Sequence, residues 1–104
     1  MPIKLPSFEE AAEGGHIRLT QRIAIAMQRD KATGQAVTEA IGRYLSGDYG
    51  DLPAADKQQN EQDIQSGTGH ILGAYKTPSG RIYINAELYR GDITPFCVMF
   101  CDEW

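Results

Sequence analysis

The stretch Ser46–Gly67, SGDYGDLPAADKQQNEQDIQSG, decides how the two halves of this chain are joined. Gly47 offers the left-handed conformation that commonly ends a helix, so one helix is expected to stop just before it. Asp51 is placed to cap a second helix, with Pro53 near its first turn, where a missing N–H costs nothing. Gly67 is then expected to end that second helix. The stretch therefore predicts a helix, a tight turn and another helix.

The clearest helical pattern lies on the N-terminal side of this stretch. Residues 35–46 carry an apolar stripe at intervals of three and four residues, made by Val37, Ala40, Ile41, Tyr44 and Leu45. Thr20 is expected to be the N-cap of a shorter helix over residues 21–28. Residues 29–34 are polar and end in Thr-Gly, so they are interpreted as a connection.

After Gly67 the apolar period changes from about 3.6 residues to two, which indicates strands. Residues 68–77 and 81–85 flank a Thr-Pro-Ser-Gly turn and are expected to form a β-hairpin. Residues 94–101 form a last strand, and residues 16–19 a short first one. The last strand is apolar on both faces, which favours a central position in a sheet. Phe96, Val98 and Phe100 face one way, and Cys97, Met99 and Cys101 face the other.

These elements predict an α+β fold. A three- or four-stranded, mainly antiparallel sheet is expected to pack one face against two to three helices, the third of which is the mostly polar helix over residues 53–66. The predicted core consists of Ile17, Leu19, Val37, Ile41, Leu45, Ile71, Ile82, Ile84, Phe96, Val98 and Phe100.

The 104 residues are enough for a single domain, residues 1–104, with one modest core. Residues 1–15 contain two prolines and a Gly-Gly pair, and are interpreted as a flexible arm or a short helix. No apolar run approaches the roughly 18 residues of a membrane span, and the start lacks the basic and apolar regions of a secretory signal. A cytoplasmic location without membrane contact is therefore expected.

The net charge of −4 is unevenly distributed. Residues 14–46 carry +3, whereas residues 47–66 hold five carboxylates against Lys57 alone and carry −4. Two solvated faces of opposite charge would explain this pattern, and so would an acidic surface that meets a protein partner with a basic surface. In the second interpretation the partner-binding residues are Asp48, Tyr49, Asp51, Glu61 and Asp63, with Tyr49 as the aromatic anchor.

No grouping of residue types marks a catalytic or metal site. His16 and His70 stand alone in strand-like segments, and no serine or cysteine has the sequence context of a nucleophile. The carboxylates of the central stretch do not follow the spacing of a calcium loop. Hence no catalytic residue, metal or cofactor is expected, and a small enzyme of unknown reaction remains an alternative.

A second alternative is a small DNA-binding regulator, in which the basic helices of residues 21–46 would contact phosphates. A sequence pI near 5 opposes phosphate contacts, so nucleic acid is not the expected partner.

Structural roles are expected for Gly47, Gly50, Asp56, Asn60, Gly67 and Gly80. The glycines serve turns. Asp56 and Asn60 align with Ile64 on one side of their helix, and are expected to tie the turn before it to the neighbouring hairpin.

The central motif and its spacing also suggest relatives. Gly47-Asp48-Tyr49-Gly50-Asp51-Leu52 is followed in order by Asp56, Asn60, Gly67, Leu72-Gly73-Ala74-Tyr75, Gly80, Glu87, Arg90 and Thr94. This series resembles a family of small uncharacterised proteins carried on plasmids and integrated mobile elements of bacteria. The closing CDEW departs from the family's PEEY-like ending.

That family has no established activity. The resemblance implies an accessory gene of a mobile element, a class that includes inhibitors of host defence such as anti-CRISPR and anti-restriction proteins. The sequence thus favours the hypothesis of a non-enzymatic protein-binding accessory protein that inhibits a host defence nuclease.

Overall fold

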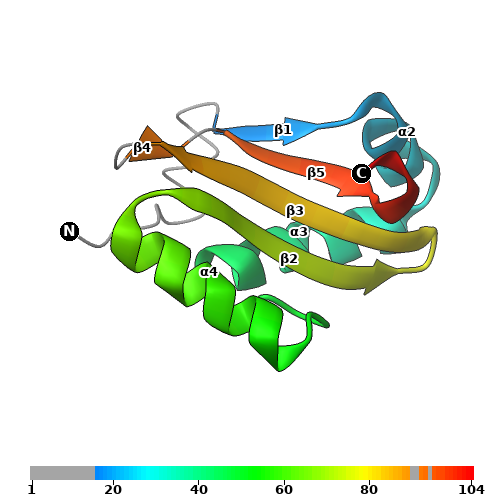
Figure 1. Ribbon diagram of the computed structural model, residues 1–104. Coiled ribbons are helices and arrows are strands. Elements are labelled where there is room, and N and C mark those ends of the chain that lie inside the picture. Colours follow the sequence, from blue (N-terminus) through cyan, green and yellow to red (C-terminus); the bar gives the residue numbers. More distant parts are fainter. Residues whose placement is uncertain (1–15, 90–91, 94) are drawn as a thin grey trace.

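The computed structural model describes residues 16–89, 92–93 and 95–104, and the predicted arm or short helix at residues 1–15 lies outside them. In chain order the elements are β1 (Ile17–Leu19), α2 (Gln21–Arg29), α3 (Lys31–Leu45), α4 (Ala54–Ser66), β2 (Gly69–Thr77), β3 (Gly80–Tyr89), β4 (Asp92–Ile93), β5 (Phe96–Phe100) and the 3₁₀ turn η1 (Cys101–Glu103). Figure 1 shows α3 behind the sheet and α4 along the β2 edge. The predicted α+β class is confirmed.

The sheet follows the strand path β1-β5-β3-β2, and the short β4 pairs with β3. β2 and β3 form the predicted hairpin, antiparallel from the pair Gly69–Leu88 to the pair Thr77–Gly80. β5 lies between β3 and β1, as its two apolar faces predicted, and it is antiparallel to β3 but parallel to β1. The sheet is therefore mixed, because β1 and β5 are joined by a long connection that permits either direction.

The core lies between the sheet and the helices α2 and α3. The apolar stripe of α3 is buried as predicted, through Val37, Ala40, Ile41 and Tyr44. The Tyr44 ring meets Phe96 edge-to-face with centroids 5.4 Å apart, and its hydroxyl donates to the Ile71 carbonyl oxygen at 2.7 Å. An aromatic side chain buried in this way keeps its polar atom satisfied while its ring fills the core.

Most of the predicted core is confirmed. Ile17 and Leu45 are partly buried and pack against the core. Leu19 was predicted to be buried, and this is wrong, since it remains 40% exposed. β1 is the edge strand of the sheet, so its last side chain has neighbours on one side only.

Two element boundaries differ from the prediction. The connection expected at residues 29–34 is helical, because Asp30 caps α3 by accepting from the Ala32 N–H at 3.2 Å and from the Thr33 hydroxyl at 2.7 Å. β3 continues to Tyr89 instead of ending at residue 85. A side-chain cap extended α3 toward its N-terminus, and pairing with β2 and β4 extended β3 beyond residue 85.

Candidate functional site

The turn before α4 is built onto the outer edge of β2. The Ala74 N–H donates to the Tyr49 carbonyl at 3.1 Å, and the Asp51 N–H donates to the Ala74 carbonyl at 2.8 Å. Gly50 between them has φ of 72°, and a Cβ at this position would collide with the Ala74 carbonyl oxygen. Glycine is therefore required here both for its left-handed backbone and for its missing side chain. The other predicted turn glycines, Gly47, Gly67 and Gly80, also have positive φ.

The outer edge of β2 is also covered by α4, whose side chains bond the strand's backbone. The Asn60 side-chain amide donates to the Leu72 carbonyl at 2.7 Å, and its oxygen accepts from the Leu72 N–H at 3.1 Å. The Asp63 carboxylate accepts from the His70 N–H at 3.2 Å. Residues 70, 72 and 74 of β2 are thus all bonded on their outward side, which prevents this edge from pairing with another strand.

Asn60 was predicted to tie the turn before α4 to the hairpin, and it does bind the hairpin strand β2 and is only 3% exposed, although the turn itself is held to β2 by its own backbone groups. Asp56 instead lies exposed in the first turn of α4. A carboxylate at this position is stabilised by the partial positive charge at the N-terminus of the helix. The prediction that Asp56 contacts the hairpin is wrong.

Asp51 does not cap α4, contrary to the prediction. The N-cap position is Pro53, which has no side-chain cap bond and whose carbonyl accepts the first helical N–H groups, from Asp56 at 3.0 Å and Lys57 at 3.1 Å. The Asp51 backbone is held by Ala74, so its side chain is exposed to solvent. The pairing of the turn with β2, which the local sequence does not encode, holds the Asp51 backbone away from the N-cap position that the sequence predicted for it.

Tyr49 lies in the core and is 4% exposed, so it cannot be the aromatic anchor of an interaction surface. Its ring meets Tyr44 edge-to-face with centroids 6.3 Å apart, and its hydroxyl donates to Glu61 Oε1 at 3.3 Å. Burial, followed by the nearby Glu61 carboxylate, raises the pKa of Tyr49 to about 12. The prediction failed because a single aromatic residue in a polar turn carries no sign of which way it points.

Asp48 is engaged by a neighbouring arginine. Arg43 Nε donates to its carboxylate at 2.7 Å, and the Gly50 N–H donates to the same carboxylate at 3.1 Å. The arginine hydrogen bond lowers the pKa of Asp48. The Arg43 guanidinium also lies over the Tyr75 ring, 5.2 Å from its centroid. Sequence reasoning placed Arg43 in the basic half of the chain and missed that it neutralises the first carboxylate of the acidic stretch.

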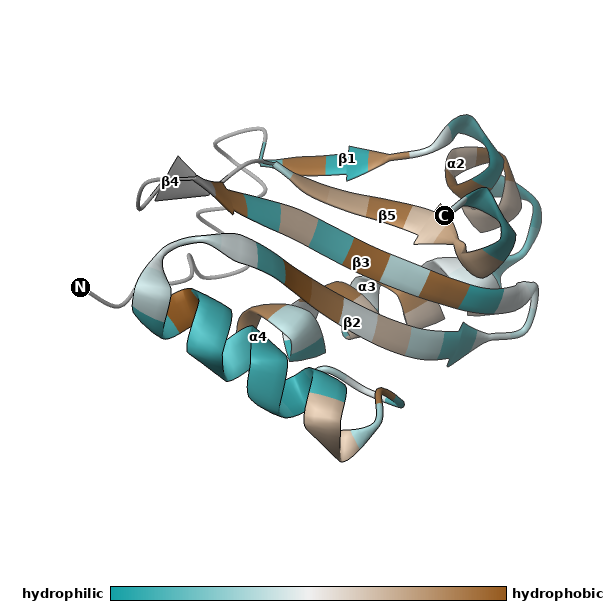
Figure 2. Ribbon diagram, in the orientation of Figure 1, coloured by the Kyte–Doolittle hydropathy of each residue, from teal (hydrophilic) through white to brown (hydrophobic). Residues whose placement is uncertain are grey.

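The remaining acidic residues form a surface defined here as the α4 surface, consisting of Asp51, Asp56 and Glu61, all exposed. Lys57 is the one cation in α4. Figure 2 shows that α4 is hydrophilic over most of its length. A shallow groove of about 550 Å³ on this helix is lined by Gln58, Glu61, Gln62, Gln65 and Ser66. Amide and carboxylate groups of this kind bind donors and cations, and they include no nucleophile paired with a base.

Of the basic residues of α2 and α3, two form ion pairs with carboxylates and two are exposed near the junction of the helices. Arg22 pairs with Asp102 at 3.0 Å, and Arg43 pairs with Asp48, whereas Arg29 and Lys31 are exposed near the junction of the two helices. Two of these four basic residues, which the DNA-binding alternative would direct at phosphates, are therefore already paired with carboxylates.

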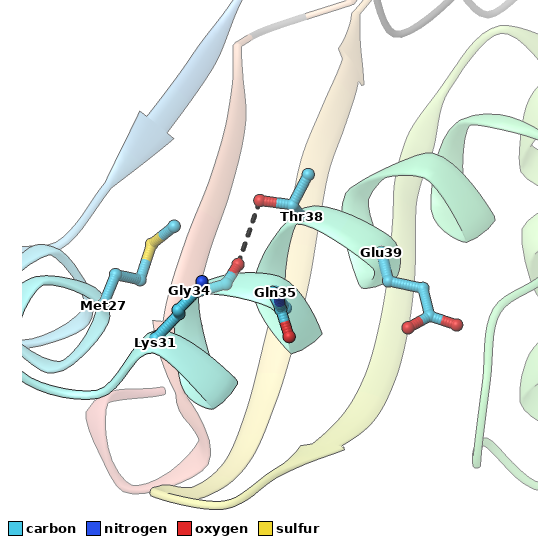
Figure 3. A pocket seen from close by; sticks show the side chains of 6 residues that line it. All are labelled: Met27, Lys31, Gly34, Gln35, Thr38 and Glu39. Atoms are coloured by element: carbon cyan, nitrogen blue, oxygen red, sulfur yellow. Dashed lines mark hydrogen bonds between the residues drawn. The ribbon is translucent and has the colours of Figure 1, made fainter.

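A second shallow groove, of about 550 Å³, lies beside that junction (Figure 3). Met27 of α2 lines one side, and the rest is lined by α3 residues Lys31, Gly34, Gln35, Thr38 and Glu39. The Thr38 hydroxyl donates to the Gly34 carbonyl at 2.9 Å. That bond lies within the helix, so this hydroxyl is engaged by its own backbone rather than aimed at a ligand.

Within the described ranges, no three His, Cys, Asp or Glu side chains come together in a way that could hold a metal ion. None of the described helices has the length and apolar character needed to cross a membrane. No protein-family model matches the chain, and neither the curated proteins nor the solved structures gave a match.

Proposed function

We propose that this chain is a non-enzymatic protein-binding protein that presents its α4 surface to a partner with a basic surface. One observation carries the proposal: α4 is attached to the sheet through Asn60 and Asp63, and the carboxylates of Asp51, Asp56 and Glu61 remain exposed to solvent. A fixed array of exposed carboxylates raises the association rate with a positively charged surface and sets orientation.

The more specific part of the proposal is that the chain is an accessory protein of a mobile element and that its target is a host defence nuclease. Its support is the resemblance carried by the Gly47–Leu52 motif and the residues that follow it. Nucleases of CRISPR and restriction systems hold nucleic acid in positively charged channels, and a carboxylate surface could compete for such a channel.

The test combines binding and inhibition. Purified chain is mixed with a CRISPR effector nuclease or a restriction enzyme, and both capture and DNA cleavage are measured at low and high salt. The triple variant D51N/D56N/E61Q removes the charges and keeps hydrogen-bond acceptors, including the one facing Tyr49. It should weaken capture and inhibition by about tenfold or more at low salt, since charge complementarity mainly raises the association rate.

Two matched variants sharpen this test. Glu39→Gln removes one carboxylate from the exposed side of α3 and should leave binding unchanged, whereas Glu61→Gln should weaken it. Lys57→Gln makes the α4 surface more negative and should strengthen binding. If the triple variant folds and inhibits as well as the parent, the α4 surface is not the binding site. If no nuclease is captured or inhibited, the inhibitor function is excluded for the enzymes tested.

A further inference from the structure

The face of the sheet turned away from α2 and α3, called here the open face, is covered by no helix in the part of the chain that the structure describes (Figure 1). Its side chains alternate along each strand with those of the core. Strand pairing sets them in two neighbouring rows. One row is Ala74, Tyr83 and Met99, and the next is Leu72, Asn85, Cys97 and Arg18.

The apolar members of these rows form a lane across the strands, which the polar Asn85 interrupts and in which Ala74 is fully buried. Tyr83, Met99, Leu72 and Cys97 are partly buried, so each keeps some surface toward solvent. The lane is extended by Trp104, which is 63% exposed and meets Tyr83 edge-to-face with centroids 5.6 Å apart. Tyrosine, tryptophan and methionine are the residue types enriched in protein interfaces over the rest of the surface.

The thiols on this face behave as apolar groups. Burial raises the pKa of Cys97 and of Cys101, so both stay protonated near neutral pH. A protonated, partly buried cysteine packs as a small hydrophobe and is a poor nucleophile. The lane is therefore a contact surface and offers no reactive thiolate.

Cations border the lane on two sides. Lys76 and Arg81 face each other across β2 and β3 in the row beyond Tyr83, and Arg18 lies at the β1 end of the other row. All three are exposed, and on the opposite side of the lane His70 and Glu87 face each other across β2 and β3 in the row beyond Asn85. The nearest C-terminal acids are engaged elsewhere, since Asp102 pairs with Arg22 and Glu103 accepts from the Thr20 hydroxyl.

We propose that the open face binds an acidic amphipathic helix of a partner protein. The apolar side of that helix packs on the lane, and its flanking carboxylates meet Lys76, Arg81 and Arg18. A helix fits because rows on one face of a sheet are roughly 6.6 Å apart, so that two rows match the 10–12 Å diameter of a helix. The other face of this same sheet is covered by α2 and α3.

A protein helix fits better than single-stranded nucleic acid. Three cations allow few phosphate contacts, and a chain with a net charge of −4 repels a polyanion as a whole. The open face is separate from the α4 surface, and its occupant has the opposite charge. The two surfaces would therefore bind different partners, or different segments of one partner, and this inference does not depend on the nuclease target.

Trp104 is the single tryptophan of the chain, so its fluorescence reports directly on the open face. The probe is a synthetic amphipathic peptide of about 18 residues, with leucines at helical spacing on one side, three glutamates flanking them, and alanine and glutamine at the other positions. A matched peptide has lysine in place of every glutamate. The glutamate peptide should change the fluorescence saturably and bind about tenfold or more tightly than the lysine peptide.

Reversing the charges of Lys76 and Arg81 tests whether the peptide binds at the open face. The variant K76E/R81E should bind the glutamate peptide about tenfold or more weakly, which corresponds to about 1.4 kcal/mol. The control R29E/K31E makes the same change in charge at exposed helix positions and should bind it as the parent does. If K76E/R81E does not fold by circular dichroism, K76Q/R81Q replaces it, with a smaller loss in the same direction.

Three outcomes would overturn the proposal. They are equal binding of the two peptides, no fluorescence change with either, and tighter binding of an oligothymidine of roughly 15 nucleotides than of the glutamate peptide. The variant D51N/D56N/E61Q should still bind the glutamate peptide. Loss of nuclease capture in that variant therefore concerns the α4 surface alone, and loss of peptide binding in K76E/R81E concerns the open face alone.

Discussion

The helices α3 and α4 are attached to the same sheet in different ways. α3 buries an apolar stripe, and its polar contacts to the hairpin come from two buried residues, the Tyr44 hydroxyl on the Ile71 carbonyl and the Thr33 hydroxyl with the Ser79 hydroxyl. α4 has Asn60 as its buried residue and reaches the sheet through side-chain bonds to the β2 backbone. One helix is held by the removal of apolar surface from water, and the other by the need to satisfy backbone groups at a sheet edge.

This difference explains why α4 can be polar on nearly all sides. A helix attached by a few directional bonds does not need a wide apolar stripe, so its outer residues are free to vary in charge. It also predicts different responses to substitution. Changes under α3 should cost stability in proportion to the cavity they leave, whereas changes under α4 should cost stability in proportion to the hydrogen bonds they break.

The largest effect is expected from Phe96→Ala, which removes the ring packed against Tyr44 under α3. Phe96 is 1% exposed, so the change leaves a cavity and should lower the free energy of unfolding by about 3–5 kcal/mol. Urea unfolding followed by circular dichroism measures this. A loss below about 1 kcal/mol would mean that Phe96 is not part of the core.

Next in size is Asn60→Ala, which removes both bonds to Leu72 and leaves its N–H and carbonyl without their partner. The expected loss is about 2–3 kcal/mol, and the Leu72 amide should exchange hydrogen faster. The control is Gln62→Ala on the exposed side of the same helix, which should stay within about 0.5 kcal/mol of the parent. Equal effects of the two changes would contradict an attachment through Asn60.

A pH effect should link the core to α4 through Tyr49. Its pKa of about 12 lies above the value of about 10 in an unfolded chain. Folding therefore favours the neutral phenol, and this stabilisation is complete below about pH 10 and is lost between about pH 10 and 12. Tyr49→Phe should lose less stability than the parent over this range, as measured by urea midpoints at about pH 9 and 11. Identical losses would show that Tyr49 ionises as freely in the folded protein as in the unfolded one.

The smallest effect is expected for Asp51→Ala. An N-cap carboxylate would contribute about 0.5–2 kcal/mol, but the side chain of Asp51 makes no cap bond and only its backbone is bonded to β2. The loss should therefore stay below about 0.5 kcal/mol in thermal or urea unfolding. A loss above about 1 kcal/mol would restore Asp51 as the cap.

Much of the fold could be predicted because short-range patterns encode it. The stripe of α3, the alternation along the hairpin and the two apolar faces of β5 are each visible within a dozen residues, and each formed as predicted. The start of α3 was missed because Asp30 precedes a Thr-Gly pair that resembles a breaker, and the cap outweighed it.

The candidate site was predicted less well. Asn60 was correctly expected to bind the hairpin, but Tyr49 and Asp51 took other roles once the turn paired with Ala74. That pairing joins residues more than twenty positions apart, and no local spacing indicates it. The bond from His70 to Asp63 was also missed, although Asp63 follows Asn60 by three residues and so lies on the same side of the helix.

By itself, the sequence determined where apolar side chains had to be buried and where the chain had to turn, because both depend on neighbours within a few residues. The tertiary structure decided which backbone groups needed partners, since an outer strand such as β2 exists only after the sheet has formed. It thereby decided that Tyr49 faces the core, that Asn60 and Asp63 attach α4, and that the lane beside Trp104 stays uncovered in the described part of the chain.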